Sequence, residues 1–391
     1  MRILQIINLP SSAINFIGGQ FLYFREVGGY DMHLICSSGD NIEDFCRKNH
    51  VYYHPVKMNR QVSFMDDIKA LREIYCYIRK NKIDVVIAHQ SKGRLLGMIA
   101  ARLCGVKYRI VFAHGVVYET MSGFKRKLMI WNDRFVSALA NRVVCVSNYV
   151  IEQRKKDRID KAEKCVLLGK GSCNGLDTIY KFNPDLVSAE DINAIRCKYG
   201  LMSEDFIIGF CGRLVRDKGV IELIEAYDLF KSKHPYRSIK LFVIGQPEKR
   251  DGLPEETLSR LNSDDSIIFT GRIPFAEIQK YYLVMNVLVL PTHREGFGMV
   301  SVEAQAMRIP VIVSDYTGCA ETIINGKTGL YIDGTPNSIV KALELIIDSE
   351  YAKELGSKGR IFVSENFEHT IVRECMLNLI NSMTKNGKEK I

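Results

Sequence analysis

The sequence predicts an α/β protein made of two doubly wound domains, each with a parallel sheet between layers of helices. Short apolar runs alternate with helical patterns along all 391 residues, which is typical of parallel sheets, and eleven such runs are too many for one sheet. The alternation of apolar runs and helical patterns is interrupted at "YKFNPD", residues 180–185, and a new series of expected strands begins after it. We therefore expect domains at 1–182 and 183–391, with the last helix packing back toward the first domain.

The expected strands follow in chain order. They lie at residues 2–7, 32–36, 84–89, 108–113, 142–147 and 164–169, and then at 205–211, 238–245, 266–271, 286–291 and 310–315. Ligands of doubly wound sheets bind at the carboxyl ends of the strands. We expect the site where these ends face the cleft between the domains.

Composition and cysteine spacing exclude several protein classes. No stretch approaches the roughly 18 apolar residues that a membrane-spanning helix needs, and "MRILQIINLP" has the pattern of a first strand rather than a signal peptide. Eleven cysteines without a C-x-x-C pair favour buried thiols in a reducing cytoplasm over disulfides or zinc. We expect a cytoplasmic protein without a bound metal.

The net charge of +9 is unevenly distributed. Residues 1–185 contain 29 Lys+Arg against 17 Asp+Glu, or +12, which leaves 25 against 28, or −3, for the remainder. The basic half needs an anionic partner, and nucleic acid, anionic lipid and a phosphorylated substrate all fit the charge.

Two glycine motifs fail as nucleotide fingerprints. "NGKTG", residues 325–329, contains G-K-T, but a phosphate-binding P-loop requires glycine at the position of Glu321. "GKGSCNG", residues 169–175, lacks the spacing of the dinucleotide motif. Neither ATP nor NAD is indicated.

Two acids bracket an expected strand-to-helix turn in "EGFGMVSVEAQAM", residues 295–307. The N–H groups at the start of this helix suit an anion such as a diphosphate, and the glycines let the backbone approach it. Glu295 and Glu303 would then accept hydrogen bonds from sugar hydroxyls. The alternative is an acidic loop with a solvated Glu303, because the apolar residues of the helix, beginning with Val300, fall on another face.

Two cations follow the first strand of the second domain in "GFCGRLVRDKGV", residues 209–220. Arg213 offers a bidentate fork to phosphate and Lys218 a mobile charge, so together they can neutralise a diphosphate without magnesium. The chain contains no D-x-D motif, which agrees with metal-free binding. The alternative is a solvated loop whose charges are incidental.

The ordered motifs resemble a known family. "GR" with "KG" five residues after the Arg, "EGFG" with a second Glu eight after the first, and "NGLD" look like family-4 glycosyltransferases of the GT-B fold. "HQSKGRLLGMIAARLCGVKYRIVFAHG" followed by "RVVCVS" resembles, more narrowly, their capsule, O-antigen and exopolysaccharide branch. The likeness covers nearly the whole chain.

The resemblance implies a donor site in the second domain. Arg213 and Lys218 would bind the donor diphosphate, Glu303 the ribose hydroxyls and Glu295 the transferred sugar. Arg272 and Ile273, after "FTG", would hold the base through backbone groups. The full implied donor set is Gly212, Arg213, Lys218, Arg272, Ile273, Glu295, Gly296, Phe297, Gly298, Met299, Val300 and Glu303.

His114 of "AHG" ends an expected strand of the first domain, and the family places a histidine near the reacting centre. The implied catalytic residues are His114, Glu295, Arg213 and Lys218. The alternative for His114 is a hydrogen-bonded histidine at the end of a strand. The sequence departs from the family pattern at one place. Relatives carry a Gly-Gly turn directly after the first strand, whereas Gly18 and Gly19 come about ten residues after it, so the sequence assigns them no role.

Residues 123–140, "GFKRKLMIWNDRFVSALA", form a basic amphipathic pattern. An apolar stripe is flanked by cations, which suits contact with the headgroups of anionic lipid. The candidate contact residues are Phe124, Lys125, Arg126, Lys127 and Trp131. The alternative is a helix whose stripe packs on the core and whose charges are solvated.

The resemblance thus implies a retaining, metal-independent glycosyltransferase without a cofactor. The expected donor is a nucleotide-sugar, in particular a UDP-sugar, and the expected acceptor a polyprenyl-diphosphate-linked saccharide at the cytoplasmic face of the inner membrane. The alternatives are a sugar-nucleotide epimerase or phosphorylase of the same fold, or a non-catalytic sugar-nucleotide or membrane-binding scaffold. Nucleic acid is not expected, because the basic half lacks a reading motif.

Overall fold

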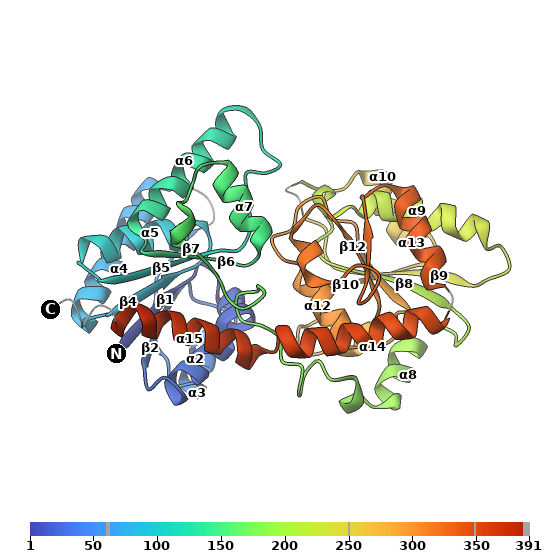
Figure 1. Cartoon of the computed structure of the whole chain (residues 1–391), viewed down its shortest axis with the longest axis horizontal. Coiled ribbons are helices and arrows are strands. Elements are labelled where there is room, and N and C mark those ends of the chain that lie inside the picture. The colour runs from blue at the N-terminus through green and yellow to red at the C-terminus, as the bar shows by residue number, and fades with distance from the viewer. Residues whose placement is uncertain (60–62, 249–250, 348, 386–391) are drawn as a thin grey trace. The chain divides into compact units, whose positions relative to one another are not determined.

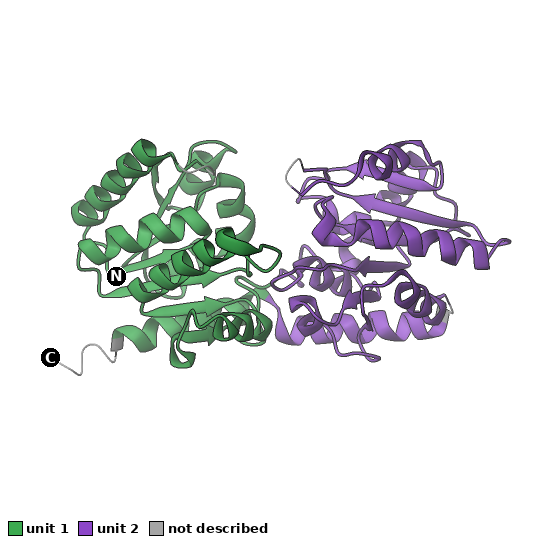
Figure 2. Ribbon diagram, turned by 90° about the horizontal axis from the view of Figure 1, so that it is seen from above, with its two compact units in different colours: residues 1–175, 369–391 green, residues 176–368 purple. Residues whose placement is uncertain are grey.

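The computed structural model describes residues 1–59, 63–248, 251–347 and 349–385, and the chain forms two compact units. Unit 1 comprises Met1–Gly175 and His369–Ile391, and unit 2 comprises Leu176–Glu368 (Figure 2). The division after Gly175 lies a few residues before the expected boundary at 182, and the last helix is part of unit 1.

Unit 1 contains a seven-stranded sheet in which all strands run parallel. Its strands are β1 (Arg2–Ile6), β2 (Asp31–Cys36), β3 (Tyr52–Pro55), β4 (Val85–Ala88), β5 (Tyr108–Ala113), β6 (Arg142–Cys145) and β7 (Cys165–Leu167). The spatial order is β3-β2-β1-β4-β5-β6-β7. The order reverses between β1 and β4, which pair directly and form the topological switch point of the unit.

Helices cover both faces of this sheet (Figure 1). They are α1 (Pro10–Ser12), the π-helical turn η1 (Ala13–Ile17), α2 (Gly18–Glu26), α3 (Ile42–Lys48), α4 (Phe64–Asn81), α5 (Ser91–Leu103), α6 (Gly123–Leu139), α7 (Asn148–Lys156), the short η2 (Ala162–Lys164) and α15 (His369–Lys385). Buried residues of α4, α5 and α6 pack with Leu4 and Ile6 of β1 into one core. The other face of β1 carries Gln5, which contacts α2.

Unit 2 repeats this arrangement with six parallel strands. They are β8 (Phe206–Cys211), β9 (Ile239–Ile244), β10 (Ile267–Gly271), β11 (Val287–Leu290), β12 (Val311–Ser314) and β13 (Leu330–Ile332), in the order β10-β9-β8-β11-β12-β13. Its switch point lies between β8 and β11, which also pair directly. The two units are therefore both Rossmann-like, and the predicted fold class is confirmed.

The helices of unit 2 complete its layers. They are η3 (Pro184–Leu186), α8 (Ala189–Lys198), η4 (Arg216–Lys218), α9 (Val220–Lys233), α10 (Glu255–Ser263), α11 (Ile278–Tyr282), α12 (Met299–Ala306), η5 (Gly318–Thr322), α13 (Pro336–Ile346) and α14 (Ser349–Asn366). Helix α12 is buried nearly all round from Ser301 to Ala306 because it lies between β11, β12 and α14.

All eleven expected strands are present, and the structure adds β3 and β13. Both added strands lie at edges of their sheets and pair on one side only. An edge strand needs no continuous apolar run: β3 contains no buried residue, and β13 has three residues. Their sequences therefore lack the signal that marks the buried strands.

Candidate active site

The loop after β11 is held close to the segment around η5 by glycines. Gly298 caps α12 with φ 91°, a conformation that side chains disfavour, and a Cβ there would lie 2.5 Å from the Cys319 sulfur. A Cβ on Gly318 would lie 2.1 Å from the carbonyl oxygen of Gly296. The backbone of "EGFG" is thus fixed in a packed turn that leads directly into the N-terminus of α12.

An ion pair joins this loop to the loop after β8. The ammonium of Lys218 lies 2.6 Å from Oε2 of Glu295 and donates to the carbonyl of Arg294 at 3.2 Å. The two loops leave adjacent strands at the switch point of unit 2, so residues 77 positions apart meet. The structure therefore brings together two of the predicted site residues.

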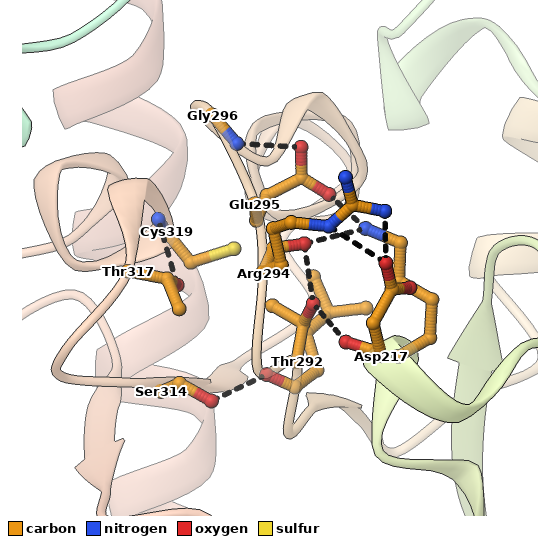
Figure 3. A network of polar contacts seen from close by, with 10 residues as sticks. Asp217, Thr292, Arg294, Glu295, Gly296, Ser314, Thr317 and Cys319 are labelled. Atoms are coloured by element: carbon orange, nitrogen blue, oxygen red, sulfur yellow. Dashed lines mark hydrogen bonds and ion pairs between the residues drawn. The ribbon is translucent and has the colours of Figure 1, made fainter. Parts of the chain in front are cut away.

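A second ion pair, Asp217 with Arg294, reinforces the same junction (Figure 3). The Arg294 side chain donates through Nε to Asp217 at 2.8 Å, and its Nη2 contacts the same oxygen. The hydroxyl of Thr292 and the backbone N–H of His293 both donate to the carbonyl of Asp217, at 3.0 and 2.8 Å. Sequence reasoning missed Asp217 and Arg294, although each stands beside a residue that it selected.

The charge of Glu295 is stabilised by this network. Burial by itself would raise its pKa, but the charge and hydrogen bond of Lys218 and the backbone N–H groups of Gly296 and Phe297 lower it overall. The side chain of Glu295 is 31% exposed, so it can accept further hydrogen bonds. Lys218 has used two of its three N–H donors, which leaves one for an anion.

Arg213 lies on the same strand-end loop but outside the network. Its side chain is 51% exposed and pairs with Glu248 at 3.1 Å. The preceding Gly212 continues the backbone pairing toward β9 by donating to the carbonyl of Ile244. An exposed guanidinium held by one exposed carboxylate can exchange that partner for another anion at low cost.

Glu303 is buried, which excludes the alternative of a solvated acid on α12. Its Oε2 accepts a hydrogen bond of 2.6 Å from the hydroxyl of Tyr282. Burial raises the pKa of Glu303 to about 7, although Tyr282 and Lys181 act in the opposite direction. Both sides of this helix pack on protein, and Val300, from the face that was expected to be apolar, is only partly buried.

The remaining predicted donor residues follow β10 and β11. Arg272 and Ile273 directly follow β10, with Arg272 exposed and Ile273 partly buried. Phe297 is buried against Phe367, and Met299 begins α12. Their proposed contacts with a donor stay predictions.

His114 directly follows β5 in unit 1, and its Nε2 lies 3.2 Å from Nδ1 of His89. His89 directly follows β4, and burial together with His114 and Arg94 lowers its pKa well below the usual range. His89 is fully buried, whereas His114 is exposed. The sequence singled out His114 and missed His89, which is itself a residue directly after an apolar run.

Gly18 and Gly19 lie in the first turn of α2 and pack on protein. A Cβ on Gly19 would lie 2.0 Å from Nη2 of Arg373, and one on Gly18 would lie 3.0 Å from Phe45. Their small size therefore allows α2 to pack against α3 and α15.

The apolar stripe of α6 faces solvent. Phe124, Leu128 and Trp131 are 79%, 52% and 63% exposed, while the face toward the core carries Ile130 and Val136. The alternative in which the stripe packs on the core is therefore wrong.

A pocket of about 560 Å³ adjoins this stripe. Its lining combines aromatic residues with cations, among them Phe124, Lys127, Trp131, Arg134, Lys156 and Arg158. Such a mixture of apolar and basic groups suits an amphiphile with an anionic head.

Within the described part of the chain, no group of three or more His, Cys, Asp or Glu is placed to hold a metal ion. Across the same residues, no helix combines the length and apolar character needed to cross a bilayer. All eleven cysteines are free thiols.

Comparisons with known proteins agree with this architecture. Residues 26–167 match the family model described as glycosyl transferase 4-like domain, and residues 191–362 match that of glycosyl transferases group 1. A glycosyltransferase from Rickettsia africae ESF-5 superposes with a TM-score of 0.79 at 21% identity, covering 98% of this chain and 99% of that one. Anabaena HepE in complex with UDP and glucose gives 0.78 at 17% identity, covering 98% and 100%.

Two curated relatives align over most of their length. CapM of Staphylococcus aureus, a capsular polysaccharide biosynthesis glycosyltransferase, is 30% identical over 97% of this chain and 97% of its own. The UDP-Gal:α-D-GlcNAc-diphosphoundecaprenol α-1,3-galactosyltransferase of Escherichia coli is 26% identical over 86% and 85%. With its two Rossmann-like units, the chain is a glycosyltransferase and belongs to family 4 of the GT-B fold, as a relative of the enzymes of capsule and polysaccharide biosynthesis.

Proposed function

We propose that this enzyme transfers a sugar from a UDP-sugar to a polyprenyl-diphosphate-linked saccharide, with retention at the anomeric carbon and without a metal ion. The observation that carries the proposal is the Lys218–Glu295 pair at the switch point of unit 2, beside the N-terminus of α12. It supports the proposal because a cation of the kind that binds diphosphates lies 2.6 Å from a carboxylate of the kind that accepts from sugar hydroxyls.

The diphosphate would bind Lys218 and Arg213 and lie near the N-terminus of α12. Lys218 has one free N–H donor, and Arg213 can exchange Glu248 for a phosphate. The N-terminus of α12 adds the positive end of a helix dipole. These groups would stabilise the charge that develops on the leaving diphosphate as the glycosidic bond breaks.

The two carboxylates would bind the two sugars of the donor. Glu303 has one oxygen engaged by Tyr282, and its other oxygen would accept from ribose hydroxyls. Glu295 would accept from hydroxyls of the transferred sugar while it remains paired with Lys218.

The donor and acceptor classes are supported by relatives. The Escherichia coli relative is named for UDP-galactose and a diphosphoundecaprenol-linked sugar, and HepE was crystallised with UDP and with UDP-glucose. Retention rests on the family resemblance, in which attack on the same face as departure needs no protein nucleophile.

The test is to incubate the enzyme with UDP-, GDP- and dTDP-sugars, with and without a polyprenyl-diphosphate-linked saccharide, and to follow nucleotide release. We expect release from UDP-sugars that is accelerated by the acceptor, and NMR coupling constants showing retained configuration in the product. Release from GDP- or dTDP-sugars alone would replace the proposed donor, and an inverted product would remove the proposed mechanism.

The exposed stripe of α6 and its basic pocket would place the enzyme on an anionic membrane surface, at the cytoplasmic face. Lys125→Gln with Lys127→Gln should weaken sedimentation with vesicles containing anionic lipid, and added salt should do the same. Lys48→Gln with Lys80→Gln, which removes equal charge from α3 and α4, is the matched control. Equal loss in both double variants would indicate general charge attraction rather than contact through α6.

A further inference from the structure

A continuous row of hydrogen bonds in unit 1 ends at His114. It begins at the backbone carbonyl of Cys173, which lies 2.8 Å from Nε2 of Gln20. Gln20 contacts Gln5 at 3.3 Å, and Gln5 contacts Nε2 of His89 at 3.0 Å. The last link joins His89 to His114 at 3.2 Å.

The row crosses the switch point of the unit. Gln5 lies in β1, His89 follows β4 and His114 follows β5, and these three strands are neighbours in the sheet. Gln5, Gln20 and His89 are fully buried. Polar groups without access to water must be satisfied by each other, so the direction of each hydrogen bond is constrained.

The carbonyl of Cys173 fixes that direction because a carbonyl can only accept. The atom of Gln20 that faces it must be the amide nitrogen, which leaves the Gln20 oxygen toward Gln5. Gln5 must then turn its own nitrogen toward Gln20 and its oxygen toward His89.

The same directions determine the tautomer of both histidines. His89 must carry its proton on Nε2 to donate to the Gln5 oxygen, and, since it is neutral, its Nδ1 is a lone pair. That lone pair accepts from Nε2–H of His114. When His114 is neutral, its Nδ1 is therefore the unprotonated nitrogen, and this nitrogen has no partner among the described residues.

We propose that Gln20, Gln5 and His89 are positioning residues that lock His114 in the Nε2–H tautomer, so that its Nδ1 accepts a hydrogen bond from a sugar hydroxyl of the substrate. The assignment of the hydroxyl rests on the proposed transferase function. The lock itself rests on the hydrogen-bond row alone.

A neutral hydrogen-bond acceptor at Nδ1 of His114 determines which kind of substrate group can bind there. An imidazole lone pair binds an O–H group and repels the oxygens of a phosphate or carbonyl, which are themselves acceptors. With the opposite tautomer, the same ring would donate from Nδ1 and lose the hydroxyl contact. The lock therefore determines which group of the substrate His114 can bind.

The tautomer is measured without substrate by ¹⁵N NMR of the histidine-labelled enzyme at pH 8, with His114 assigned from the spectrum of His114→Gln. We expect Nδ1 of His114 to show the shift and couplings of an unprotonated nitrogen, and Nε2 those of an N–H. A protonated Nδ1 in the wild type would overturn the proposal.

Breaking the row should release the tautomer. In Gln20→Met, the amide nitrogen of Gln5 loses its acceptor, so the Gln5 amide can flip and present this nitrogen to His89. We then expect a proton on Nδ1 of His114 and a kcat lowered about tenfold or more, while the KM for the donor changes little. Gln20→Glu should keep the wild-type tautomer and rate, because a carboxyl buried at this position stays protonated and replaces the amide N–H. If Gln20→Met does not fold, Gln5→Met breaks the row one link later.

Gln90→Met is the matched control, since the partly buried amide of Gln90 at the same switch point hydrogen-bonds Asn8 and Ser12 and is not part of the row. It should leave the tautomer unchanged. An unchanged tautomer in both Gln20→Met and Gln5→Met would overturn the lock, even if activity fell. A released tautomer with unchanged kcat would overturn the hydroxyl contact, whereas failure of the proposed function would appear as an absence of transfer in the wild type.

Discussion

The two units place a polar network at the same point of the same topology but build it from different groups. In unit 1 the network between β1, β4 and β5 consists of neutral amides and imidazoles, Gln20, Gln5, His89 and His114. In unit 2 the network between β8 and β11 consists of ions, with Lys218 on Glu295 and Arg294 on Asp217. The strand order sets where a ligand can bind, and the side chains set what kind.

The difference follows from burial and suits different partners. The amides and His89 are fully buried, where neutral groups in directed hydrogen bonds cost far less than charges. Glu295 is 31% exposed, so its charge and that of Lys218 can remain near water and respond to an ionic ligand. We expect unit 2 to respond to charge changes and unit 1 to respond to the direction of its hydrogen bonds.

The largest effect is expected from removing the cations of unit 2. Lys218→Ala should lower kcat/KM a hundredfold or more, because loss of one preorganised charge contact costs about 3 kcal/mol of transition-state stabilisation. Arg213→Ala should act in the same direction. Steady-state kinetics with the UDP-sugar found in the donor screen provide the measurement.

Lys280→Ala is the matched control for these variants. Lys280 makes a surface ion pair with Asp191 in the same unit, so its loss should leave the rate within about twofold of wild type. Wild-type rates and unchanged nucleotide affinity in both cation variants would show that the donor site lies elsewhere.

The next effect concerns stability. Asp217→Asn removes the buried carboxylate that pairs with Arg294, and we expect it to lower the free energy of unfolding by about 2 kcal/mol, less than for a fully buried pair because Arg294 is partly exposed. Urea unfolding measures the change. Asp191→Asn, which breaks an exposed ion pair, should lower the free energy of unfolding much less. Equal losses in the two variants would show that the Asp217–Arg294 pair stabilises the fold no more than a surface ion pair does.

Glu303 should make donor binding depend on pH. Burial raises its pKa to about 7, so the acid gains its proton as pH falls through this range and loses acceptor strength toward the ribose hydroxyls. Affinity for the intact UDP-sugar, whose diphosphate does not titrate near neutrality, should rise several-fold between about pH 6 and 7.5. Lys181, with a pKa of about 8, titrates above most of this window.

Glu303→Gln is the decisive comparison for this pH effect. Its affinity should be lower at pH 7.5 and nearly independent of pH. A wild-type slope retained in Glu303→Gln would assign the titration to another group. Calorimetry in buffers of different ionisation enthalpy would also count the protons released.

The sequence was sufficient for the fold and insufficient for the contacts of the candidate site, whose assigned roles stay predictions. Apolar runs marked every buried strand, and the loops that follow them, together with the family resemblance, indicated Lys218, Glu295 and His114. Asp217 and Arg294 were missed because a charged residue on a loop gives no local sign of a partner 77 positions away. Gln5 and Gln20 were missed because a single polar residue in an apolar strand or helix does not disclose which neighbour satisfies it.

The smallest effect is expected from removing divalent ions. Lys218, Arg213 and the N-terminus of α12 supply protein charges for the diphosphate, and the sequence has no D-x-D that would hold magnesium between carboxylates and phosphates. Activity in excess EDTA should therefore equal activity in magnesium to within about twofold. Lys218→Ala should not be rescued by added magnesium, because no metal-binding group of acids is found among the residues that the structure describes. Transfer rates are measured for both proteins in each condition. Loss of wild-type activity in EDTA with recovery on addition of magnesium would show that a metal shares the diphosphate with Lys218. The charged network of unit 2 would then depend on a bound metal ion as well as on its own side chains, unlike the neutral network of unit 1.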